Sequence, residues 1–197
     1  MITIGQRVKH AIDDIGRGEF EVALEHASIA IDITSKRKYG RQRSGRVIYK
    51  DLLKEYSWLL ELMALGGIDL EKSVFGNYPL PDNPEPSFAD LMYHVVRCGL
   101  VHEEGLPDNF AFVNNDRLVM AEDHIELPTK VIWALLGIVV FCPANSGQKT
   151  GDGYWLSIFD KKFVINESWG REDLARAVYE ERKPIRVALN WPKKEAV

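Results

Sequence analysis

The sequence predicts a mainly α-helical protein, an up-and-down helical bundle that carries two small β-hairpins. Apolar residues recur every three or four positions in several long segments, which is typical of amphipathic helices. Two pairs of short alternating runs flank turn residues at Asn114–Asp116 and Asp160–Lys161, and they predict the hairpins. The 197 residues, 46% of them hydrophobic and 27% charged, are enough to bury a sizeable core.

Three helices are predicted in the first third of the chain. The first runs from about Ile4 to Ile15 and is stopped by Gly16–Gly18. The second carries one apolar stripe from Phe20 until Gly40. The third has an apolar side from Ile48 to Met63 and ends at two glycines.

A fourth helix is predicted after a loop. The loop Tyr78–Pro86 contains four prolines, which forbid a regular helix. Ser87 then has the character of an N-cap, with Asp90 as its capping-box partner. The apolar stripe of this helix reaches Gly99.

Two domain-like parts are predicted. Residues 1–143 would form the bundle, with the first hairpin inserted at about 110–121 and a long apolar helix from near Pro128 to Cys142–Pro143. Residues 144–153, ANSGQKTGDG, have the composition of a linker.

Residues 154–197 would form an appendage that begins with the second hairpin. A helix from about Trp169 to Arg182 follows, and Ser168 is predicted to cap it. The tryptophans at 133, 155, 169 and 191 are interpreted as packing residues. The alternative is that Trp155 and Phe159 of the second hairpin stack on bases.

Composition favours a cytoplasmic protein without a metal or other cofactor. The N-terminus has no apolar run of the kind that signal peptides carry, and the apolar run Val131–Cys142 is too short to span a membrane. Two cysteines in apolar helical patterns favour reduced thiols over a disulfide. His94, Glu103 and His124 match no metal-ligand spacing.

One segment is strongly basic although the net charge of −4 does not favour a general nucleic-acid binder. Between Lys36 and Lys50 there are seven basic residues and no acidic one. Arg41, Arg43 and Arg46 are therefore candidate phosphate-binding residues. The alternative is a solvated helix end, where cations are favourable.

The stretch RCGLVH, Arg97–His102, has the most distinctive chemistry. Arginine presents a planar fork of donors to phosphate oxygens, and histidine transfers protons near neutral pH. Together they suit metal-free cleavage of RNA, with Arg97 and His102 as catalytic residues and Cys98 and Glu103 in support. The alternative is an exposed arginine beside a histidine that caps a helix end.

The run FADLMYHVVRCGLVHEEG, which contains this stretch, resembles the motif region of the HEPN superfamily, over roughly residues 19–143 in all. The resemblance implies a HEPN-like bundle and a homodimeric, metal-independent endoribonuclease in which Arg97 holds the scissile phosphate and His102 transfers the proton. Cys98 departs from the family, which commonly has a polar residue there.

Two functions stay open from the sequence. One is a HEPN-type endoribonuclease, of a stress or phage-defence kind with an antitoxin-type protein partner. The other is a non-catalytic module that binds a nucleotide, RNA or a protein.

Overall fold

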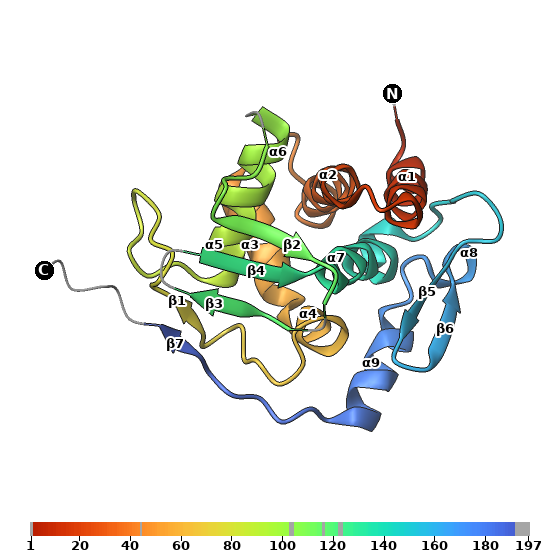
Figure 1. Ribbon diagram of the computed structural model, residues 1–197. Coiled ribbons are helices and arrows are strands. Elements are labelled where there is room, and N and C mark those ends of the chain that lie inside the picture. Colours follow the sequence, from red (N-terminus) through yellow and green to blue (C-terminus); the bar gives the residue numbers. More distant parts are fainter. Residues whose placement is uncertain (1, 44, 103–104, 116, 122–123, 192–197) are drawn as a thin grey trace, which may run out of the picture.

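The computed structural model describes residues 2–43, 45–102, 105–115, 117–121 and 124–191. About half of the chain is helical, and three small sheets accompany the helices (Figure 1). The central element is α7 (Lys130–Phe141), whose apolar side chains are almost all fully buried. The prediction of a mainly helical bundle with two hairpins was therefore only partly right, because the protein is mixed α/β.

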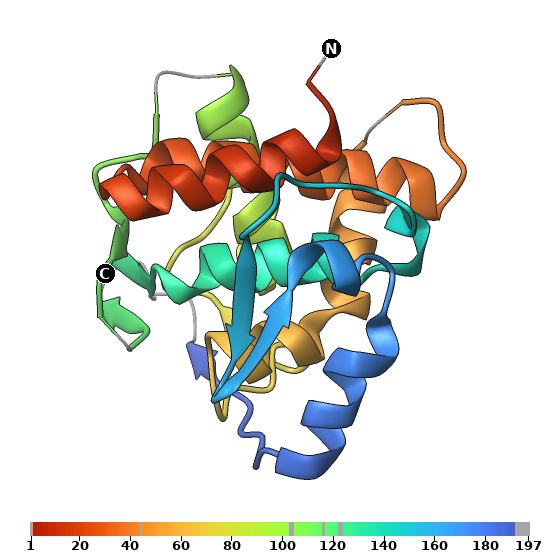
Figure 2. The same ribbon diagram turned by 90° about the vertical axis from the view of Figure 1, so that its right-hand side faces the viewer.

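The helices α1 (Ile4–Arg17) and α2 (Phe20–Lys38) form where two helices were predicted, and they lie side by side over α7 (Figures 1 and 2). Thr3 caps α1, because its hydroxyl accepts a hydrogen bond from the backbone N–H of Gln6. The helix ends at Gly18, whose φ of 80° is the left-handed conformation that favours glycine.

The predicted third helix is broken in two at Tyr56. The segments are α3 (Arg46–Glu55) and α4 (Ser57–Met63). Tyr56 leaves the helical conformation, with φ −102° and ψ 18°, and its hydroxyl donates a 2.6 Å hydrogen bond to Glu172. This partner lies more than a hundred residues further along the chain, so the apolar periodicity around Tyr56 contains no sign of the break.

The fourth helix begins where it was predicted. Ser87 caps α5 (Phe88–Leu91), and Asp90 completes the capping box. The helix then widens into a π-helix at Met92–Cys98 and ends as α6 (Gly99–His102). A Cβ at Gly99 would lie 2.9 Å from the carbonyl oxygen of Gly105, so glycine is needed where the chain passes this closely.

The first predicted hairpin was wrong in its pairing. Its two strands exist, as β2 (Phe110–Val113) and β3 (Val119–Ala121), but both pair with β4 (His124–Pro128) in the order β2-β4-β3. The β2–β4 pair is parallel and the β3–β4 pair is antiparallel. Ile125 and Leu127 are buried between partly exposed neighbours, an alternation that is visible in the sequence but was not among the predicted strands.

The second hairpin is confirmed. The strands β5 (Trp155–Ile158) and β6 (Lys161–Val164) pair antiparallel and cross beside α7 (Figure 2). Two helices follow, α8 (Ile165–Ser168) and α9 (Glu172–Arg182). The predicted cap was wrong, because Ser168 closes α8 by donating to the carbonyl of Val164, and no side chain caps α9.

The segment predicted to be a linker contacts the helices. Asn145, in a 3₁₀ turn at Pro143–Asn145, is fully buried, and its amide donates to Thr34 and to the carbonyl of Val139. The backbone of Lys149 packs against Gly5, where an added Cβ would lie 1.8 Å from the carbonyl oxygen. The division of the chain at 144–153 stays a prediction.

The chain finally runs back beneath the molecule to β7 (Asn190–Trp191), which pairs parallel with β1 (Val74–Phe75) (Figure 1). Just before β7, Arg186 lies among the carboxylates of Glu61, Asp69 and Glu71. The sequence analysis did not predict this parallel pair, because two residues are too few to show strand periodicity.

Candidate functional site: an aromatic cavity beside α7

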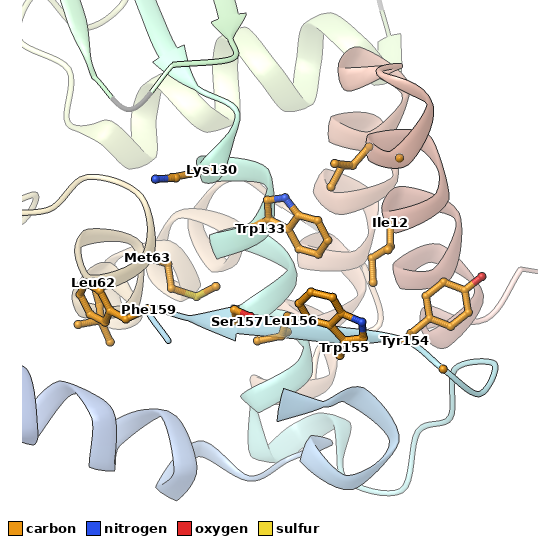
Figure 3. A pocket seen from close by; sticks show the side chains of 13 residues that line it. Ile12, Leu62, Met63, Lys130, Trp133, Tyr154, Trp155, Leu156, Ser157 and Phe159 are labelled. Carbon is orange, nitrogen blue, oxygen red and sulfur yellow. The ribbon is translucent and has the colours of Figure 1, made fainter. Parts of the chain in front are cut away.

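A cavity of about 630 Å³ lies between α1, the end of α4, α7 and the β5–β6 hairpin (Figure 3). Its size is within the ~300–1,000 Å³ range of small-molecule sites. We call it the aromatic cavity, and it is lined by Ile12, Ile15, Gly16, Leu62, Met63, Lys130, Trp133, Gly153, Tyr154, Trp155, Leu156, Ser157 and Phe159.

The alternation of β5 supplies one wall. Leu156 and Ile158 are buried beneath the hairpin, whereas Trp155 and Phe159 are 46% and 54% exposed. Phe159 has a φ of 53°, a left-handed conformation that is unfavourable for a large side chain. The hairpin therefore holds Phe159 at the edge of the cavity at some cost in backbone strain.

The opposite walls come from α1 and α7. Ile12 and Ile15 lie on one face of α1, and Trp133 projects from the first turns of α7 (Figure 3). Tyr154 links the hairpin to α1, because its hydroxyl donates a 2.7 Å hydrogen bond to Asp13. Partial burial works against ionisation of Asp13, but hydrogen bonds from Lys9 and Tyr154 hold its pKa below the ordinary value.

Cations stand over three of the aromatic rings. The ammonium of Lys162 lies 4.0 Å from the ring centroid of Trp155. The guanidinium of Arg182 lies 4.9 Å from the centroid of Phe159, and the ammonium of Lys9 lies 5.5 Å from that of Tyr154. The arrangement suits a molecule with an apolar body, since aromatic and aliphatic groups line its walls and positive charge surrounds them.

Sequence reasoning missed this site. Its residues lie in segments around positions 12, 63, 133 and 155, which no local pattern connects. The available signal was Trp155 at the start of β5 and Phe159 in the turn that follows it, two large aromatic residues at exposed positions of one hairpin.

The structure places Arg97 on the π-helix, with its side chain 15% exposed. One guanidinium nitrogen lies 3.8 Å from a carboxylate oxygen of Asp32, and the guanidinium carbon lies 5.8 Å from the ring centroid of Tyr93. A phosphate bound by Arg97 would therefore compete with Asp32.

His102 is the last residue of α6, and its side chain lies outside the described residues, as does Glu103. The predicted meeting of Arg97 and His102 therefore stays a prediction. Cys98 is partly buried.

The structure brings together only some of the predicted phosphate-binding residues. Arg41 and Arg43 are exposed in the connection before α3, and Arg46 is partly buried at the first turn of α3. Burial raises the pKa of the Tyr93 hydroxyl, while the charges of Arg97 and Arg46 both act to lower it. Arg46 and Arg97 belong to two elements that contact each other, α3 and the π-helix.

In the described part of the chain, no three histidine, cysteine, aspartate or glutamate residues are grouped so that they could hold a metal ion. The helices that the structure describes are also too short or too polar to cross a membrane.

A family model with the description Rv1289 matches residues 3–194. The chain belongs to the Rv1289 family. It is similar to the uncharacterized protein Rv1289 of Mycobacterium tuberculosis and to the uncharacterized protein Mb1320 of Mycobacterium bovis. Each is 31% identical over 202 residues, which cover 96% of this chain and 94% of the relative. No solved structure matches the chain significantly.

The predicted HEPN membership was wrong. The Rv1289 family model covers nearly the whole chain, including the segment after residue 143 that the HEPN resemblance left out. A three-stranded sheet, β2-β4-β3, follows α6, where the prediction was a HEPN-like bundle with an inserted two-stranded hairpin. An arginine and a histidine five positions apart were too short a pattern to identify a family.

Proposed function

We propose that this Rv1289-family protein binds a small, largely apolar molecule in the aromatic cavity. The observation that carries the proposal is the cavity itself, about 630 Å³ with four aromatic side chains among its lining residues. Pockets of this size with mainly apolar walls are typical of small-molecule sites.

The exposure of the aromatic residues supports the proposal. Trp155 and Phe159 keep about half of their surface accessible, although burial of such side chains stabilises proteins by about 1.5–3 kcal/mol each. A molecule that covers them would gain part of this free energy. The walls are also preorganised, because the Tyr154–Asp13 hydrogen bond joins the hairpin to α1 before any ligand arrives.

The test is a fluorescence titration with N-phenyl-1-naphthylamine, a neutral apolar probe. We expect wild-type protein to enhance the emission of the probe. Trp155→Ala should weaken binding because it removes a wall of the cavity, and Ser157→Trp should weaken it because the larger side chain fills the space. Ile185→Ala is the control, because Ile185 is 85% exposed and does not line the cavity. Equal binding by wild type and both cavity variants, or no binding by wild type, would contradict the proposal.

RNA cleavage by Arg97 and His102 is a second candidate. The observation in its favour is that α3, whose first turn carries Arg46, contacts the π-helix that carries Arg97, so that the two guanidinium groups belong to neighbouring helices. Cleavage in EDTA by wild type, and loss of cleavage in Arg97→Ala and His102→Ala at unchanged stability, would support it. Absence of cleavage of mixed-sequence RNA by wild-type protein would rule it out.

A further inference from the structure

We infer that the ligand of the aromatic cavity is an amphipathic anion, an apolar body with one anionic group that binds at Lys130. The inference rests on the proposed function and adds the charge of the ligand to it. Lys130 is the only charged side chain among the described lining residues, and no carboxylate of the described chain lines the cavity.

The position of Lys130 gives the cavity two different ends. Lys130 and Trp133 are three residues apart on α7, and Figure 3 shows their side chains extending in different directions from its first turns. The apolar lining from Ile12 and Leu156 lies further along. A ligand with its anionic group at Lys130 can therefore place its apolar body against Trp133 and the hairpin.

The backbone adds to the positive charge at this end. Lys130 is the first residue of α7, and the side chain of Thr129 accepts no capping hydrogen bond there. The N-terminal end of a helix carries partial positive charge, which favours an anion. The ammonium group of lysine has three N–H donors, so Lys130 can bind an anion while it keeps a contact within the protein.

The surroundings disfavour a cationic ligand. Lys162, Arg182 and Lys9 stand over the rings of Trp155, Phe159 and Tyr154. Two of these cations have carboxylate partners, since Lys9 pairs with Asp13 and Arg182 pairs with Asp160. Those carboxylates are themselves paired with cations and do not line the cavity, so among the described residues a cationic ligand would meet positive charge without a carboxylate on the cavity wall.

The test compares two probes that share one skeleton. 1-Anilinonaphthalene-8-sulfonate carries a sulfonate, and N-phenyl-1-naphthylamine is its uncharged counterpart. We expect wild-type protein to bind the sulfonate about tenfold more tightly, the difference that one charge-assisted hydrogen bond supplies. Added salt should weaken the binding of the sulfonate and leave that of the neutral probe unchanged.

Variants assign the preference to Lys130. Lys130→Met keeps a long unbranched side chain without the charge, and we expect it to remove the preference while the neutral probe binds as before. Lys130→Arg should keep the preference. Lys162→Met is the comparison: it removes a cation over the ring of Trp155 that does not itself line the cavity, so it should lower the preference less than Lys130→Met does.

The outcomes separate the inference from the proposed function. Equal affinity of wild type for both probes, or loss of the preference in Lys162→Met but not in Lys130→Met, would overturn the inference and leave apolar binding intact. Failure of wild type to bind either probe would overturn both. Binding of the sulfonate that survives Ser157→Trp would place it outside the cavity and overturn the inference as well.

Discussion

The guanidinium group of Arg186 contacts the buried carboxylate of Glu61, with Nε 2.7 Å from Oε2. Its terminal nitrogen also lies 3.0 Å from a carboxylate oxygen of Asp69. Glu61 and Asp69 are 1% and 4% exposed, so Arg186 supplies the positive charge that two buried anions need. This contact attaches the C-terminal segment to α4.

Arg186→Met should lower the free energy of unfolding by about 3 kcal/mol, because removal of one partner leaves buried charge unpaired. Urea denaturation at neutral pH measures the change. Arg171→Met is the matched control, since Arg171 pairs with Asp173 on the surface, where such pairs contribute about 0–1 kcal/mol. An equal effect of the two substitutions would contradict this account.

Asp90 should make stability depend on acid pH. Burial of the Asp90 carboxylate acts to raise its pKa, but the hydrogen bonds from Lys50 and Ser87 outweigh this and hold the pKa at about 2, below the ordinary value of 3.8. A carboxyl group whose pKa is lower in the folded chain than in the unfolded chain stabilises the fold at pH values above its unfolded pKa. This stabilisation is lost as the pH falls through the folded pKa of about 2.

Asp90→Asn should therefore destabilise the protein by about 2 kcal/mol at pH 7, and by about 1 kcal/mol less at pH 3. Denaturant titrations of wild type and variant at both pH values measure the difference. Asp82→Asn, at an exposed position close by, is the control. If the difference in the free energy of unfolding between wild type and Asp90→Asn were as large at pH 3 as at pH 7, the pKa of Asp90 would not account for the effect.

Two glycines of α1 should respond to alanine in opposite directions. A Cβ at Gly5 would lie 1.8 Å from the backbone oxygen of Lys149, whereas a Cβ at Gly16 meets nothing within 4 Å. We expect Gly5→Ala to destabilise the protein by more than about 2 kcal/mol through overpacking. Gly16→Ala should stabilise it by up to about 1 kcal/mol through helix propensity. Thermal unfolding of both variants checks the prediction, and a Gly5→Ala protein as stable as wild type would refute it.

Substitution of Phe159 should affect stability and ligand binding in different directions. Its φ of 53° is tolerated much better by asparagine, so Phe159→Asn should leave the stability unchanged or raise it by up to about 1 kcal/mol. The same variant should bind N-phenyl-1-naphthylamine more weakly, because it removes a wall of the aromatic cavity. Thermal unfolding and the probe titration measure the two effects. A clear loss of stability together with wild-type binding would show that Phe159 serves packing alone.

Elements held by local interactions were predictable from the sequence. The Ser87–Asp90 capping box, the glycine stop after α1 and the β5–β6 hairpin each depend on residues a few positions apart. The break at Tyr56 and the parallel β2–β4 pair depend on distant partners, and neither leaves a local pattern.

The candidate site was not predictable for the same reason. Trp133 and Trp155 have the apolar character of ordinary packing residues, and only the folded chain shows that half of Trp155 remains accessible beside a cavity. The stretch Arg97–His102 was interpreted as functional because the residue types alone suggest catalysis, without any knowledge of where they lie in the folded chain.

The ion pairs of Arg186 also set an order of events during protein synthesis. Glu61 leaves the ribosome 125 residues before Arg186, the separation between the two in the chain. At roughly 5–20 residues per second, this interval lasts several seconds or more. The nascent N-terminal part therefore cannot complete the packing around Glu61 and Asp69 until Arg186 has been synthesised and has left the ribosome.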